Sequence, residues 1–147
     1  MIRPSILLAT VVLAAATTAA AQTASDTAPR GVPMEAPVLA GATADPACGG
    51  LYDLAGKAFC VTAPLASISA LAESYIAHFE SEGWIAAAGE SNRVVFVKRK
   101  PGGGCDGMQL QAFYDTSRPA SPQAPGYIGM ATIPGDVCAA ATTPSAP

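Results

Sequence analysis

The stretch PLASISALAESYIAHFESEGWIAAAGESNRVVFVKRK, residues 64–100, decides the fold of this chain. Across its first half, apolar residues recur at steps of three and four, which places them in one helical stripe about 140° wide. These residues are Leu65, Ile68, Leu71, Ala72, Tyr75, Ile76 and Phe79. Pro64 suits the first helical turn, where its missing N–H is not needed. The pattern predicts an amphipathic helix that begins near Pro64.

The helix is predicted to end at Gly83, because glycine readily takes the left-handed conformation that closes many helices. Trp84 follows this glycine and Phe79 lies four positions before it, and these two positions touch in a Schellman stop. Beyond the stop, residues 84–88 and the β-branched run 93–100 predict two strands joined by a short polar turn.

Two more strands are predicted over residues 108–114 and 126–133, since apolar and polar residues alternate in the first of them. Residues 46–62 are rich in glycine and predict an irregular segment that ends in a short strand near 58–62. Taken together, the elements predict an α+β fold with one amphipathic helix packed on a four-stranded antiparallel meander.

The chain has four cysteines, and in a short exported chain this number predicts two disulfides. We expect the pairs Cys48–Cys60 and Cys105–Cys138. Zinc is the competing interpretation, but the sequence has no Cys-x-x-Cys pair and only one histidine.

The second disulfide carries a prediction of strand register. If Cys105 faces Cys138 across the last hairpin, Leu110 lies opposite Ile133 on the inner side of the sheet. Phe113 then lies opposite Met130 on the outer side.

Residues 1–21 resemble a secretory signal peptide, with Arg3 before a short apolar run and small residues at 19–21. An uncleaved membrane anchor is the alternative interpretation. We expect the mature chain to begin at Gln22 and to hold no transmembrane segment. Export to a bacterial periplasm or to the extracellular space follows from this leader and from the cysteines.

The mature chain is predicted to have three parts. Residues 22–45, rich in alanine, threonine and proline, predict a flexible linker. Residues 46–138 predict a single small domain, and residues 139–147 a disordered tail. Loss of Arg3 with the leader takes the formal net charge from −3 to −4, which gives no general attraction for nucleic acid.

Two surfaces are candidates for binding a partner. Four basic residues of the strand at 93–100, namely Arg93, Lys98, Arg99 and Lys100, offer a site for a protein or an anionic envelope component. The alternative is a solvated strand end that prevents edge aggregation. Phe113 and Met130 form a second candidate on the outer sheet face. Here the alternative is that residues 51–54 cover them.

Catalytic residues are sparse. His78 is the only histidine, and Glu82 one turn later, or Glu73, could orient it as a general base. The alternative is an ordinary exposed helical pair. No serine lies in a nucleophile-elbow motif, and the glycines at 102–104 lack the Lys-Ser/Thr of a phosphate loop.

The function expected from these observations is a small exported, disulfide-stabilised module that binds a ligand or associates with the envelope, without a cofactor. Two alternatives stay open. One is a small periplasmic enzyme that uses His78 with a helical glutamate, and the other is a purely structural envelope protein.

Overall fold

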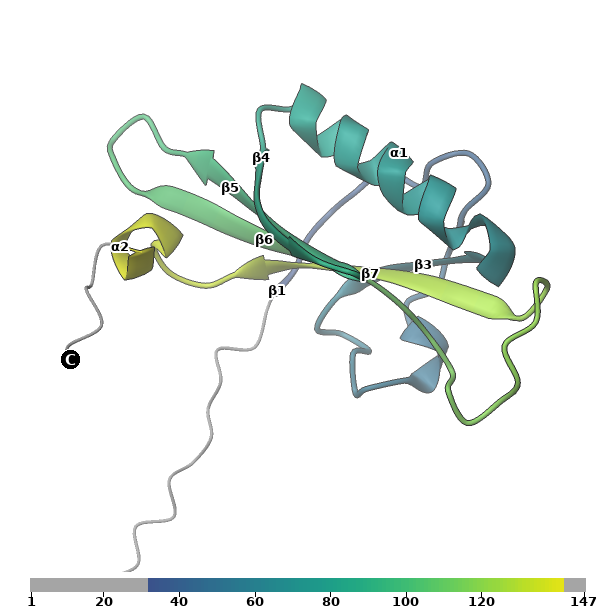
Figure 1. Cartoon of the computed structure of the whole chain (residues 1–147). Helices are drawn as coiled ribbons and strands as arrows, with labels where there is room; N and C mark the ends of the chain where they lie inside the picture. Colours follow the sequence, from purple (N-terminus) through teal and green to yellow (C-terminus); the bar gives the residue numbers. More distant parts are fainter. Residues whose placement is uncertain (1–31, 142–147) are drawn as a thin grey trace, which may run out of the picture.

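The computed structural model describes residues 32–141 and places one long helix on an antiparallel sheet (Figure 1). A 3-10 turn, η2 (Leu65–Ser67), leads into α1 (Ile68–Ser81). The predicted apolar stripe is confirmed, because its residues Ile68, Leu71, Tyr75 and Phe79 are buried against the sheet.

The predicted helix stop is also confirmed. Gly83 has a φ of 86°, and its N–H donates to the carbonyl of Glu80 over 3.0 Å. The N–H of Trp84 donates to the carbonyl of Phe79 over 3.0 Å. These two hydrogen bonds define the Schellman motif, which directs the chain from α1 into the first strand of the meander.

The sheet is larger than the predicted four-stranded meander, so that expectation is wrong. Along the sheet the order is β2-β3-β7-β6-β5-β4, and β1 pairs with β7. The strands are β1 (Val32–Pro33), β2 (Thr43–Ala44), β3 (Phe59–Pro64), β4 (Ile85–Glu90), β5 (Arg93–Arg99), β6 (Cys105–Tyr114) and β7 (Pro125–Ile133). Strand β3 adds to the outer edge of β7 because Val61 and Ala63 can then face α1 and enlarge the core.

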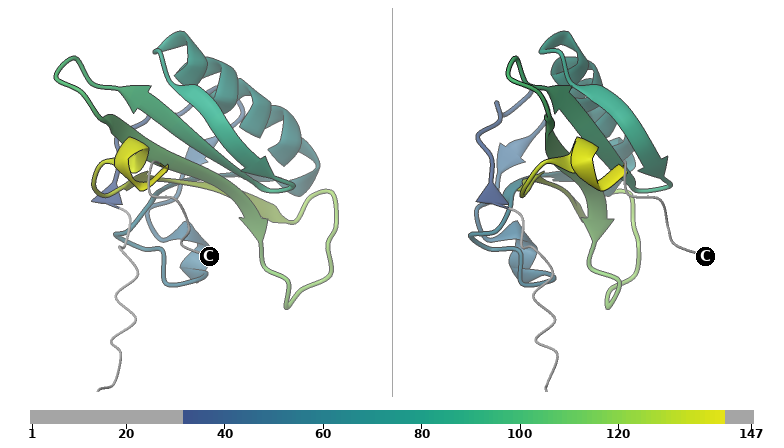
Figure 2. Two further views of the ribbon diagram at one scale, coloured as in Figure 1. Left: turned by 60° about the vertical axis from the view of Figure 1, so that its left-hand side comes forward. Right: turned by 90° about the vertical axis from the view of Figure 1, so that its left-hand side faces the viewer.

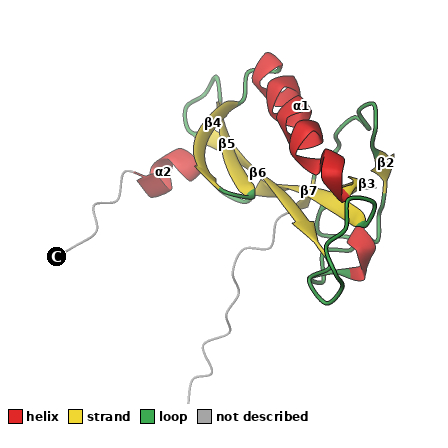
Figure 3. Cartoon of the chain, turned by 45° about the vertical axis from the view of Figure 1, so that its right-hand side comes forward, coloured by secondary structure: helices red, strands yellow, loops and turns green. Residues whose placement is uncertain are grey.

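The main core lies between α1 and the sheet. Its sheet residues are Val61, Ala63, Phe96, Met108, Leu110, Ile128 and Met130. A smaller cluster lies on the opposite face, where Cys48, Ala58, Cys60 and Phe113 are buried. Figures 2 and 3 show α1 on one side of the sheet and the short η1 helix (Cys48–Gly50) on the other.

The predicted register of the last hairpin is wrong. Leu110 lies opposite Met130, and Phe113 lies opposite Tyr127. The disulfide does not report this register, because Cys138 lies beyond β7 in the short helix α2 (Val137–Ala141).

Both predicted disulfides are present. Cys48–Cys60 and Cys105–Cys138 each join Cα atoms 5.3 Å apart. The first closes the η1 segment onto β3, and the second holds α2 to the start of β6.

Asp136 caps α2. Its Oδ1 atom accepts hydrogen bonds from the N–H groups of Cys105 at 2.9 Å and Cys138 at 3.0 Å. The bond from Cys105 makes the largest contribution to holding the pKa of Asp136 below its ordinary value. The predicted tail at 139–147 overlaps the end of α2, which continues to Ala141, and residues 142–147 lie outside the described part of the chain.

The predicted linker over 22–45 does not extend through residues 32–45. Met34, Ala36, Leu39 and Ala42 pack against the main core. The predicted leader at 1–21 and the linker portion at 22–31 lie outside the described residues. The ordered domain therefore begins before Pro46.

Tyr75 of α1 holds this N-terminal segment in place. Its hydroxyl donates to the carbonyl of Pro37 over 2.8 Å and accepts from the N–H of Leu39 over 3.2 Å. Burial raises the pKa of the Tyr75 phenol above its ordinary value of 10.0, and the bond from Leu39 lowers it in part.

This burial predicts a loss of stability at alkaline pH. The folded pKa is above the unfolded one, so the stabilisation is complete below about pH 10 and declines as pH rises through the folded pKa. Tyr75→Phe should cost about 2 kcal/mol at pH 8, because two backbone groups lose a partner. The stability gap between parent and variant should narrow above pH 10 in denaturant melts. A gap that is constant to pH 11.5 would contradict the burial of this phenol.

Candidate ligand-binding site

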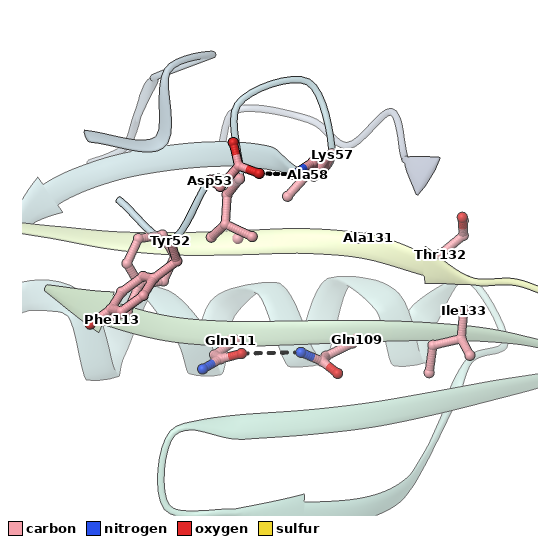
Figure 4. Close-up of a pocket in the computed structure, with 12 residues that line it drawn as sticks. Tyr52, Asp53, Lys57, Ala58, Gln109, Gln111, Phe113, Ala131, Thr132 and Ile133 are labelled. Carbon is pink, nitrogen blue, oxygen red and sulfur yellow. Dashed lines mark hydrogen bonds and ion pairs between the residues drawn. The ribbon is translucent and has the colours of Figure 1, made fainter. Parts of the chain in front are cut away.

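The sheet face turned away from α1, here called the open face, carries a cavity of about 480 Å³. It lies between the loop of residues 51–58, here called the Tyr52 loop, and strands β6 and β7 (Figure 4). The lining residues are Tyr52, Asp53, Leu54, Lys57, Ala58, Gln109, Gln111, Phe113, Gly129, Ala131, Thr132 and Ile133. A volume of this size falls within the range of small-ligand sites, roughly 300–1,000 Å³.

The Tyr52 loop forms one wall of the cavity and is tied down at both ends. The Cys48–Cys60 disulfide joins the segments on either side of it. Within the loop, the carbonyl of Leu54 accepts the N–H groups of Lys57 at 2.9 Å and Ala58 at 3.1 Å. These bonds give the loop a defined shape over the sheet.

Two consecutive residues of this loop hold left-handed backbone conformations. The φ angles of Tyr52 and Asp53 are 54° and 53°. For a residue with a side chain this costs about 1–2 kcal/mol. Strained backbone of this kind clusters at ligand sites, so the pair makes the Tyr52 loop a candidate for one.

The strained backbone places the Tyr52 ring at one end of the cavity. The ring meets Phe113 edge-on, with centroids 5.6 Å apart and planes at 80°. Tyr127 stacks on Phe113 at 5.4 Å and supports it. Tyr52 nevertheless remains 63% exposed, which is unusual for a large aromatic residue held in one place. The cavity therefore has an aromatic surface available for contact.

The polar groups of the cavity floor come from β6. Gln109 donates from Nε2 to Oε1 of Gln111 over 3.1 Å, and both side chains lie along the strand (Figure 4). A glutamine amide has two N–H donors and a carbonyl acceptor. The pair consequently leaves the Nε2 donors of Gln111 and the Oε1 acceptor of Gln109 for a ligand.

The charges on the lining cancel. Lys57 forms an ion pair with Asp53 on the Tyr52 loop (Figure 4). The remaining lining residues are neutral. The site therefore presents no net charge to a ligand.

The basic residues predicted as a partner site are spread over β5. Arg93 begins the strand and pairs with Glu90 at 2.8 Å. It is about 20 Å from Arg99, at roughly 3.3 Å per residue. At the other end, the Lys98 ammonium lies 5.7 Å from the centre of the Trp84 ring.

The other two basic residues lie near that same end. The Nζ atom of Lys100 is 3.6 Å from Oδ1 of Asp106. Arg99 is exposed and has no ion pair within residues 32–141. The structure thus brings Lys98, Arg99 and Lys100 near one another but leaves Arg93 apart.

Phe113 and Met130 do not form the predicted exposed surface. Met130 is fully buried beneath α1, and Phe113 is only 8% exposed on the opposite face. The alternative, that residues 51–54 cover the outer face, is confirmed at Phe113 by its contact with Tyr52. Of the two predicted residues, Phe113 alone lines the cavity.

His78 lines neither this cavity nor the smaller one, of about 260 Å³, beside Tyr114 and Arg118. Its Nε2 atom lies 3.4 Å from Oε1 of Glu82, and Glu73 is exposed on the same helix. The His78 side chain is partly exposed, but its Nε2 atom is buried and has no hydrogen-bond partner within the described residues, so the contact with Glu82 is a loose helical pair.

Within residues 32–141, no cluster of three or more His, Cys, Asp or Glu side chains is arranged to hold a metal ion. The same part of the chain contains no helix that is both long and apolar enough to span a membrane.

No family model, curated protein or solved structure matches this chain.

Of the residues that line the cavity, only Phe113 was predicted as a binding residue. The aromatic side chain of Tyr52 and the amides of Gln109 and Gln111 are among those that were missed. The alternation in β6 did indicate that both glutamines share a face. The signal that could have located the site is this pair of amides in a central strand, next to an aromatic residue at 113. The predicted hairpin register did not lead to this site, because that register put Met130 instead of Gly129 and Ala131 on the same face as the two glutamines.

Proposed function

We propose that this protein is a binding module whose site is the open-face cavity, and that its ligand is a compact, uncharged molecule. The observation that carries the proposal is Tyr52, an exposed ring held by strained backbone beside a cavity with free amide groups. Strained backbone of this kind clusters at ligand-binding and active sites. The apolar lining with a few placed polar groups matches the composition of small-ligand pockets.

The proposal includes export. The two disulfides fit an oxidising compartment such as a periplasm or the extracellular space. They also give a rigid site, because one of them anchors the Tyr52 loop. A rigid site loses little conformational entropy when it binds.

The Lys98–Lys100 end of β5 is a less favourable site for the partner. Lys98 lies over the Trp84 ring and Lys100 pairs with Asp106, so an anionic partner would have to compete with both contacts. The His78–Glu82 pair lines neither of the two cavities described above, which makes the enzyme interpretation less favourable than binding.

The binding proposal is tested by titrating labelled protein with uncharged sugars, capped dipeptides and nucleosides, and recording backbone and side-chain amide shifts. We expect at least one probe to shift the signals of Tyr52, Gln111 and Gly129. Tyr52→Ala should weaken that binding at least tenfold. Tyr114→Ala, at a tyrosine outside the cavity, should change it less than twofold. Shifts centred on α1 or on the β5 end, or no shifts with any probe, would contradict the proposal.

A further inference from the structure

We infer that the ligand of the open-face cavity is an N-acetylated sugar, either a monosaccharide or a short oligosaccharide whose pyranose rings carry acetamido groups. The inference rests on the proposed function, since it assigns a chemical class to the ligand of that same site. It follows from the charge, the amide groups, the aromatic surface and the position of the cavity on the sheet.

The balance of charge selects a neutral ligand. The Lys57 ammonium and the Asp53 carboxylate form an ion pair, so the lining carries no net charge. A charged ligand would lose hydration in the cavity and would meet no net counter-charge there, which is unfavourable. Sugars whose amines are acetylated meet this condition.

The two glutamines match an acetamido group. Gln111 offers N–H donors and Gln109 offers a carbonyl acceptor, and they are successive residues on one strand face. A secondary amide needs one partner of each kind, an acceptor for its N–H and a donor for its C=O. The acetyl methyl group then has apolar side chains beside it, since Ala131 and Ile133 line the same cavity (Figure 4).

The aromatic end of the cavity suits a pyranose ring. Tyr52 is supported edge-on by Phe113 and presents exposed ring surface. A pyranose carries an apolar face of C–H groups that packs on such a ring and buries area. Along β6 the distance from Gln109 to Phe113 is about 13 Å, which accommodates two linked rings.

The position of the cavity disfavours a peptide. An extended peptide binds by adding a strand to a sheet edge, where backbone N–H and C=O groups are free. Here β6 and β7 lie inside the sheet, and each is paired on both sides. The cavity therefore recognises its ligand through side chains, as a compact ring compound requires.

The test compares N,N′-diacetylchitobiose with cellobiose, which has the same linked rings but no acetamido groups. Calorimetry and amide shifts should give at least tenfold tighter binding for diacetylchitobiose, with movement of the Gln111 side-chain N–H signals. Gln111→Leu and Gln109→Leu, each checked by thermal melting, should each reduce this preference to threefold or less. The matched control is Gln123→Leu in an exposed loop, which should leave the preference unchanged.

Equal binding of the two sugars, or tighter binding of N-acetylalanine methylamide, would overturn the assignment to an N-acetylated sugar. If neither sugar shifts Tyr52 or Gln111 while another uncharged probe does, the sugar class is wrong and the binding site stands. If no probe shifts these residues, both the sugar class and the binding site are wrong.

Discussion

Replacing Phe79 with alanine should lower the free energy of unfolding by about 4 kcal/mol. Phe79 is only 1% exposed and lies between two other aromatic rings of the core. Its ring centroid is 6.2 Å from that of Tyr75 and 5.8 Å from that of Phe96. Truncation removes this contact and leaves a cavity that the surrounding helix and strands cannot fill. Chemical denaturation monitored by the fluorescence of Trp84 would measure the change.

The matched control is Ile85→Ala on the edge strand β4. Ile85 is 56% exposed, so its truncation should cost less than about 1 kcal/mol. A Phe79→Ala protein within 1 kcal/mol of the parent would mean that α1 does not pack on the sheet as described.

Removing the Cys105–Cys138 disulfide should lower the free energy of unfolding by about as much as Phe79→Ala does. The double variant Cys105→Ser/Cys138→Ser should lose about 4 kcal/mol, while Cys48→Ser/Cys60→Ser should lose about 3 kcal/mol. The order follows from loop closure, because the two bridges span 33 and 12 residues. Denaturation without reductant would compare both variants with the parent. The reverse order would show that loop entropy does not govern these bridges.

The same variant should have a local effect at α2. The bridge holds α2 against β6, and the carboxylate of Asp136 links the Cys105 N–H to the first turn of α2. Without the bridge, amide hydrogen exchange in α2 should become faster, while exchange in α1 should follow only the global loss of stability.

Local patterns predicted the elements of this fold well. The stripe of α1 and the stop at Gly83 depend on side-chain spacing and on backbone conformation within a few residues. The strands β5, β6 and β7 also followed from local alternation and β-branched content.

The sheet order and the site were harder to predict because they depend on contacts between distant segments. Strand β3 precedes α1 in the sequence but pairs with β7. This pairing depends on how β3 packs in the core and not on the local pattern of its residues. The predicted register places Cys138 opposite Cys105 across the last hairpin. Because Cys138 lies in α2, beyond β7, that register is wrong, and Met130 faces α1 instead of the open face. The cavity depends on the Tyr52 loop folding back over β6, which no periodicity indicates.

The position of β7 has a consequence for how the chain folds during synthesis. Strand β7, the last strand within residues 32–141, lies in the interior of the sheet, with β3 on one side and β6 on the other. Cys60 pairs with Gly129, which follows it by 69 positions, and contacts this distant in sequence form slowly. A nascent chain that ends before Pro125 therefore carries two separate pieces of sheet, each with an unpaired edge. Such edges are prone to associate with other chains, so a chaperone that holds the nascent protein until β7 emerges should improve its yield.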